Sequence, residues 1–95
     1  MADDENLTLL AELSVRVDNA QRDFQRVADE AFDRLKVIDP DLAVAVQNLF
    51  GLRQKAVSWL ATARLGDYSN AYAVLAAGNR DLILETMTRV EYGIF

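Results

Sequence analysis

The feature that most constrains this fold is a long stretch near the N-terminus without proline or glycine. Residues 7–37 contain neither, and these are the two residue types that most often interrupt a helix. At a rise of 1.5 Å per residue, one helix over this stretch would be about 45 Å long. That is long for a domain of 95 residues. The sequence therefore predicts one extended N-terminal helix.

Apolar residues along this helix recur in alternating steps of three and four, the spacing of a heptad seam between two helices. The seam consists of Leu10, Leu13, Val17, Ala20, Phe24, Val27 and Ala31, and Arg34 ends it. We expect two chains to associate through Leu10, Leu13, Val17, Phe24 and Val27, giving a homodimer. The alternative is an ordinary amphipathic helix that folds onto its own chain. A flanking set indicates contact with the rest of the chain: Leu9, Ala28, Phe32 and Leu35.

The single proline and the four glycines divide the remaining residues into short helices. Asp39 precedes Pro40, which is the pattern of an N-cap followed by proline at the first helical position. Each glycine follows an apolar segment, where a left-handed residue closes a helix: Gly51, Gly66, Gly78 and Gly93. Ser69 or Asn70 and then Asn79 are placed as N-caps. We expect helices over residues 40–50, 52–65, 71–77 and 80–92.

These signals predict an all-α fold, in which a long N-terminal helix is followed by a compact bundle of about four short helices. Trp59, the only tryptophan, lies at helical spacing from Ala56 and Leu60, which favours a core position over an exposed interface anchor. For Tyr68 and Tyr72 the two interpretations remain balanced.

Charge is distributed unevenly along the chain. The net charge is −5; residues 1–41 hold eleven acids against five bases, and residues 42–95 hold four acids against five bases. Binding to duplex DNA depends on neutralising phosphates, so we do not expect the chain alone to bind DNA. With no cysteine, no signal-peptide pattern and no apolar run long enough for a bilayer, we expect a cytoplasmic protein without a membrane segment.

The residue types needed for common catalytic and metal sites are scarce. Histidine and cysteine are both absent, which removes the usual general base, the thiolate nucleophile and the soft metal ligands. The densest acidic groups are Asp29, Glu30 and Asp33, and then Asp39 and Asp41. Charged helix faces and helix caps explain them. We therefore expect no enzymatic activity, no bound metal and no cofactor.

The C-terminal half carries a family resemblance. Its elements are Phe50-Gly51, Lys55-Ala56, Trp59-Leu60, Leu65-Gly66, Val74-Leu75 and Arg89-Val90-Glu91-Tyr92-Gly93-Ile94-Phe95. In this order and spacing they resemble the C-terminal toxin-binding domain of the Xre/MbcA/ParS antitoxin family. Two features depart from the family pattern. The turn before the penultimate helix, Asp67-Tyr68-Ser69-Asn70-Ala71, lacks a helix-starting proline, and no helix-turn-helix is evident upstream.

The resemblance implies a function and a set of contact residues. The partner in that family is a RES-domain toxin that consumes NAD, and the antitoxin's C-terminal segment plugs the active-site cleft of the toxin. By that resemblance the contact residues would be Arg89, Glu91, Tyr92, Gly93, Ile94 and Phe95. The apolar residues Ile94 and Phe95 suggest independently that something covers this end. Residues 1–38 would form the dimerising helix and residues 39–95 the toxin-binding domain. The alternative is a self-associating helical scaffold or adaptor without a toxin partner.

Overall fold

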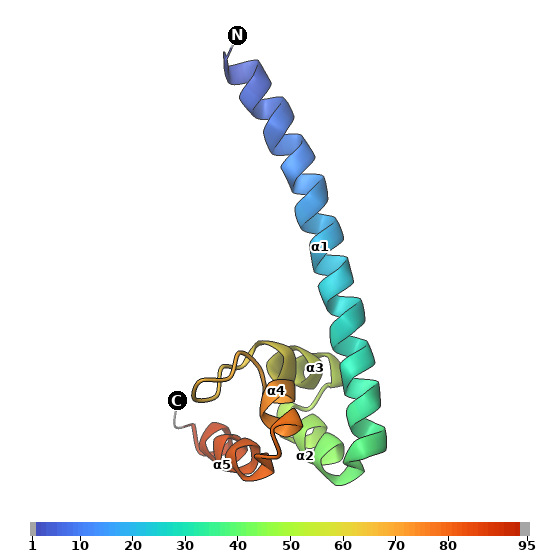
Figure 1. Cartoon of the computed structure of the whole chain (residues 1–95), viewed down its shortest axis with the longest axis vertical. Coiled ribbons are helices and arrows are strands. Elements are labelled where there is room, and N and C mark those ends of the chain that lie inside the picture. The colour runs from blue at the N-terminus through green and yellow to red at the C-terminus, as the bar shows by residue number, and fades with distance from the viewer. Residues whose placement is uncertain (1, 94–95) are drawn as a thin grey trace.

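A computed structural model describes residues 2–93 of the chain, with side chains from residue 4 onward. The described residues form α-helices and no strand, so the all-α prediction is confirmed (Figure 1). The helices are α1 (Ala2–Ile38), α2 (Pro40–Phe50), α3 (Arg53–Thr62), α4 (Ala71–Ala76) and α5 (Arg80–Glu91). Helix α1 begins earlier than residue 7, because Asp4 and Glu5 in its first turns are stabilised by the positive end of the helix dipole.

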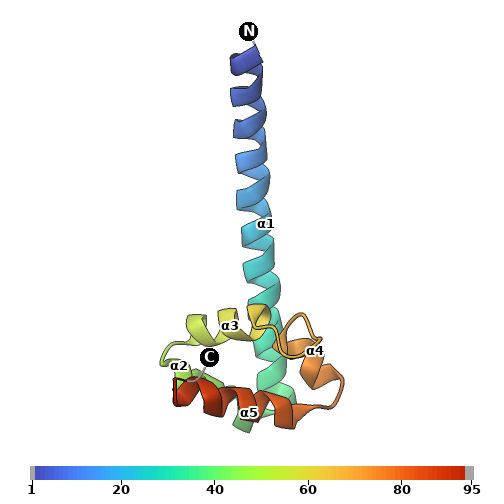
Figure 2. The same cartoon turned by 90° about the vertical axis from the view of Figure 1, so that its left-hand side faces the viewer.

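Helix α1 has a projecting part and an anchored part. The molecule measures 57 × 29 × 26 Å, and Figure 2 shows most of α1 standing clear of the body that α2 to α5 build around its last turns. Every side chain described from Asp4 to Phe24 is exposed. The chain's own helices therefore leave the N-terminal two thirds of α1 uncovered.

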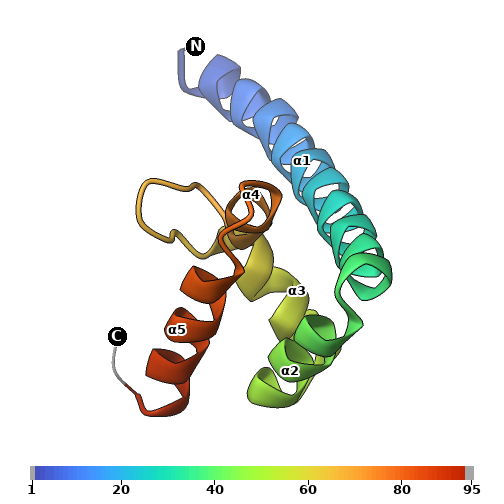
Figure 3. The same ribbon diagram turned by 60° about the horizontal axis from the view of Figure 1, so that its bottom comes forward.

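The core lies where the last turns of α1 meet the other four helices. Helix α1 contributes Ala28, Phe32 and Leu35, all buried, so the predicted contact with the rest of the chain is confirmed for these residues. Leu9, from the same predicted set, is exposed near the far end of α1. The remaining core residues are Leu42, Ala43, Val46, Ala56, Val57, Leu60, Leu65, Ala71, Val74, Ile83 and Met87. Helix α5 lies on the side of the body away from α1 (Figure 3).

Asp39 separates α1 from α2 and links α2 to α5. Its Oδ1 accepts a hydrogen bond from the Leu42 N–H at 3.2 Å, which confirms the predicted N-cap ahead of Pro40. Its Oδ2 accepts a second bond from Arg80 Nε at 2.6 Å. One carboxylate thus satisfies the start of α2 and holds the first residue of α5 beside it.

The structure corrects the prediction for Asn79. Asn70 caps α4 as expected, because its Oδ1 accepts from the Ala73 N–H at 3.0 Å. Asn79 makes no such side-chain bond at the start of α5. Its backbone N–H instead bonds to the Val74 carbonyl at 3.1 Å, while Gly78, at φ +81°, bonds to Leu75. These two bonds form a Schellman motif, so Asn79 serves the end of α4.

The predicted end of the third helix is also wrong. Helix α3 stops at Thr62 rather than at residue 65, and Gly66 does not close it. Leu65 and Tyr68 instead exchange backbone hydrogen bonds of 3.0 and 3.3 Å across a two-residue turn. Gly66 takes the first turn position with φ +59°, where glycine is favoured. This turn places Leu65 in the core with 5% of its surface exposed.

The double role of Asp39 predicts its mutational and pH effects. Asp39→Ala removes the cap and the partner of Arg80, so the free energy of unfolding should fall by about 1–2 kcal/mol in urea titrations. Asp39→Asn keeps a capping oxygen and should lose less. Equal losses in the two variants would contradict the capping role.

The charge of Asp39 should also make stability depend on pH. The hydrogen bond from Arg80 lowers the carboxyl pKa; partial burial raises it, and the Leu42 N–H again lowers it. Because the net shift in the folded state is downward, this stabilisation is present above the unfolded pKa, about 3.9. It is lost as the pH falls through the lower folded value. Below about pH 4 the wild type should therefore lose stability more steeply than Asp39→Asn.

Candidate functional site

The end of α5 carries the predicted partner-binding residues. Arg89, Glu91, Tyr92 and Gly93 are all exposed, and Tyr92 has 74% of its surface accessible. Ile94 and Phe95 lie outside the described residues. One helical turn earlier, Met87 is buried, as is Ile83. The exposed residues therefore follow directly from a part of α5 that is fixed in the core.

Two grooves flank this end of α5. One, of about 350 Å³, lies against α3 and the Leu65–Tyr68 turn and is lined by Trp59, Leu82, Arg89 and Val90 among others. The other, of about 370 Å³, lies against α2 and is lined by Leu49, Leu84, Met87 and Glu91 among others. Arg89 and Glu91 thus border different grooves on the two sides of the helix.

Local contacts order these side chains to different degrees. The Arg89 guanidinium donates to Glu85 Oε1 at 2.8 Å, one turn earlier on α5. This pair is exposed and contributes only a few tenths of a kcal/mol, so a partner can replace it at little cost. Glu91 has no ion-pair partner among the residues that the structure describes.

Trp59 has both a core contact and a groove contact. Its ring centroid is 5.3 Å from that of Phe50, with the two planes tilted by 38°, and it packs against the buried cluster while keeping part of its surface exposed. Trp59 therefore packs on the edge of the core rather than inside it, so the predicted core position is confirmed only in part. Trp59 also lines the groove beside Arg89. The spacing of residues in the sequence did not predict this second position.

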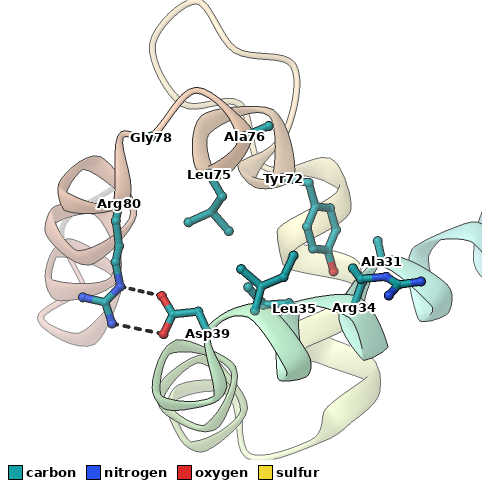
Figure 4. Close-up of a pocket in the computed structure, with 10 residues that line it drawn as sticks. Ala31, Arg34, Leu35, Asp39, Tyr72, Leu75, Ala76, Gly78 and Arg80 are labelled. Carbon is teal, nitrogen blue, oxygen red and sulfur yellow. Dashed lines mark hydrogen bonds and ion pairs between the residues drawn. The ribbon is translucent and has the colours of Figure 1, made fainter.

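A third groove was not anticipated from the sequence. It has a volume of about 400 Å³ and lies between the last turns of α1, helix α4 and the α4–α5 turn (Figure 4). Leu35, Tyr72 and Leu75 form its apolar wall, and the Asp39–Arg80 pair lies at one edge. Its residues come from three elements that are far apart in sequence, so no local pattern predicted the groove. The only indication in the sequence was that Tyr72 could be an interface residue.

The hydroxyl of Tyr72 is buried in this region without a hydrogen-bond partner among the described residues. Burial raises the pKa of the phenol to about 12, because the charged phenolate loses hydration. An unpaired buried hydroxyl is unfavourable for folding.

The seam residues on α1 form a separate apolar surface. Leu10, Leu13, Val17, Phe24 and Val27 each keep between 49% and 62% of their surface exposed. All five lie on α1, whereas the predicted partner-binding residues lie at the end of α5. No other helix of the described chain covers the seam residues.

The acidic groups on α1 have a structural role. Asp33 pairs with Arg53 of α3 at 3.0 Å, and Asp29 lies 4.0 Å from the same guanidinium. Within the described range, no cluster of three or more acidic residues has a geometry suited to a metal ion. Among the described helices, none combines the length and the apolar composition needed to cross a membrane.

The buried hydroxyl predicts the behaviour of Tyr72→Phe. Removing an oxygen without a partner should leave the free energy of unfolding unchanged or raise it by about 1 kcal/mol.

The wild type should lose stability as the pH rises from about 10, the unfolded pKa of tyrosine, towards about 12, the pKa of Tyr72 in the folded chain, because only the unfolded chain ionises easily. Tyr72→Phe should lack this loss, whereas Tyr68→Phe should retain it. A Tyr72→Phe variant destabilised by more than about 1 kcal/mol would show that the hydroxyl has a partner.

No family model, no curated protein and no solved structure matches this chain. The likeness to the antitoxin family therefore depends on the sequence elements of the C-terminal half alone.

Proposed function

We propose that this chain is an antitoxin-like protein that binds and inhibits a cognate RES-type, NAD-consuming toxin. Binding would use the end of α5, with Arg89, Glu91 and Tyr92 as described contacts and Gly93, Ile94 and Phe95 continuing into the active-site cleft of the toxin. The chain itself would be non-enzymatic and would hold no cofactor. It would act in the cytoplasm.

The observation that carries the proposal is the exposure of Tyr92 and its neighbours immediately after a buried part of α5. Tyrosine is among the residues that most often dominate binding energy at interfaces. Here it is 74% exposed and makes no contribution to the core. An exposed aromatic residue held beside a fixed helix is suited to entering a partner's pocket.

Helix α5 supports this role because its position is fixed before binding. Ile83 and Met87 anchor it in the core, and Arg80 ties its first turn to Asp39. A binding segment that is already ordered before association loses little conformational freedom when the partner binds. A partner that encloses the end of the helix would meet Arg89 along one groove and Glu91 along the other.

The elements that carry the family resemblance divide by location in a way that fits this function. Ala56, Leu60, Leu65 and Val74 are buried, so they shape the body. Arg89, Glu91 and Tyr92 are exposed, so their side chains are free for a partner. A packing pattern alone would not require those exposed residues to have these identities.

Truncation and point variants test the toxin-binding role. Deleting residues 93–95 should abolish co-purification with the RES-type protein while leaving helicity and melting temperature nearly unchanged. Tyr92→Ala should weaken binding by about 2 kcal/mol or more in calorimetry. Asp81→Ala, an exposed change at the opposite end of α5, serves as the matched control and should bind like wild type. Full affinity in the truncated protein would refute the proposal.

The alternative function is a self-associating scaffold or adaptor without a toxin partner, and the uncovered apolar seam of α1 favours it. Gene neighbourhood separates the two. An adjacent gene for a RES-type protein supports the antitoxin, whereas neighbouring phage or structural genes support the scaffold.

A further inference from the structure

We propose that a second copy of this chain covers the seam of α1, and that the two α1 helices run antiparallel. The N-terminal part of each α1 would then lie against the body of the other copy. This inference concerns assembly and does not depend on toxin binding.

The uncovered surface has the size of a specific interface. Among the large apolar side chains of α1 that have roughly half or more of their surface exposed, seven lie on or beside the seam: Leu7, Leu9, Leu10, Leu13, Val17, Phe24 and Val27. At roughly 100 Å² each they offer about 700 Å² per chain, close to the value of about 800 Å² per partner in stable complexes. An apolar surface of this extent on a small protein is typical of an interaction site.

Antiparallel pairing gives the more even core. If Val17 faces Ala20 of the second copy, the heptad spacing places Leu13 opposite Phe24 and Leu10 opposite Val27. A parallel pair would instead place each residue opposite its own copy. Phe24 would meet Phe24 and Ala20 would meet Ala20, which gives one crowded layer next to one underfilled layer. The antiparallel register avoids both.

Charges beside the seam favour the same direction. Arg16 and Asp23 flank the seam on one side, seven residues apart. In an antiparallel pair, equivalent flanking positions approach each other, so Arg16 of each chain lies beside Asp23 of the other. In a parallel pair, Arg16 would face Gln21 and Asp23 would face Ala28, without an ion pair.

Both charges are available for this contact. Asp23 already accepts from Arg26 on its own helix, but a carboxylate has further acceptor sites. Arg16 has no ion-pair partner within the described part of its own chain.

A groove at the end of the seam distinguishes the two directions. Phe24, Val27 and Ala31 of α1 form a groove of about 130 Å³ together with Ala61, Asn70 and Tyr72 of the body. In the antiparallel register, Leu7 of the second copy falls beside Ala28 at this groove. Leu7 is 64% exposed in the single chain. In a parallel pair the carboxylate of Asp23 would occupy this apolar position, where it would lose hydration without compensation.

Disulfide trapping tests the direction, because the chain has no cysteine of its own. The double variant L10C/V27C should form covalent dimers under mild oxidation, because position 10 of each chain would face position 27 of the other. L10C alone should remain largely unlinked, because its two copies would lie about 25 Å apart. Efficient linkage of L10C alone would show a parallel pair and would overturn the proposal.

Charge reversal tests the register independently. R16E should raise the dimer dissociation constant roughly tenfold or more at low salt, and R16E/D23K should recover most of that loss. R22E makes the same charge change on the outer face of α1 and should leave dimerisation intact. Equal weakening by R16E and R22E, or no recovery in the double variant, would contradict the predicted Arg16–Asp23 contact.

Light scattering tests whether the seam pairs at all. Wild type at about 100 μM should be a dimer, because side chains of this size are enough for micromolar association. V17E/F24E should be a helical monomer, since both side chains are exposed in the single chain and changing them leaves the body intact. A wild type that is monomeric at this concentration would refute the proposal.

Discussion

The burial of Phe32 is the contact on which the arrangement of this molecule depends. Its side chain is fully buried at the junction of α1 with the body, and the guanidinium of Arg53 lies 4.9 Å from its ring centroid. Arg53 in turn pairs with Asp33 on α1. Replacing Phe32 with alanine would cost about 3–5 kcal/mol, a large share of the stability of a small domain. Because α1 is held only through these last turns, its remaining length projects from the body.

This anchoring separates the two surfaces that we propose for interaction. The seam of α1 faces a second copy in our proposal, whereas the end of α5 lies on the far side of the body (Figure 1, Figure 3). Pairing through α1 would therefore leave the C-terminal end of α5 accessible in each copy of a dimer. An antiparallel pair would also place the two bodies at opposite ends of the assembly. The proposed self-association and the proposed binding of another protein would therefore not compete.

Sequence patterns predicted the features that depend on neighbouring residues. The all-α fold, the Asp39 cap and the left-handed glycines are local, and each is present in the structure. The end of α3 and the role of Asn79 were predicted wrongly, because the Leu65–Tyr68 turn and the Schellman motif depend on how the chain packs afterwards. The groove beside Tyr72 joins α1, α4 and the α4–α5 turn, so no local pattern could indicate it. The exposure of Arg89, Glu91 and Tyr92 agrees with their predicted availability, while their binding role stays a prediction.

Hydrogen exchange along α1 is the most direct test of the division of this helix into an anchored and a paired part. Amides near residues 28–38 should be protected at every protein concentration, because the chain's own core covers them. Amides of residues 10–27 should become protected only as the concentration rises into the range of dimer formation. Strong protection of residues 10–27 in dilute monomer would mean that the chain covers its own seam. An absence of protection at every concentration would mean that no second copy covers the seam.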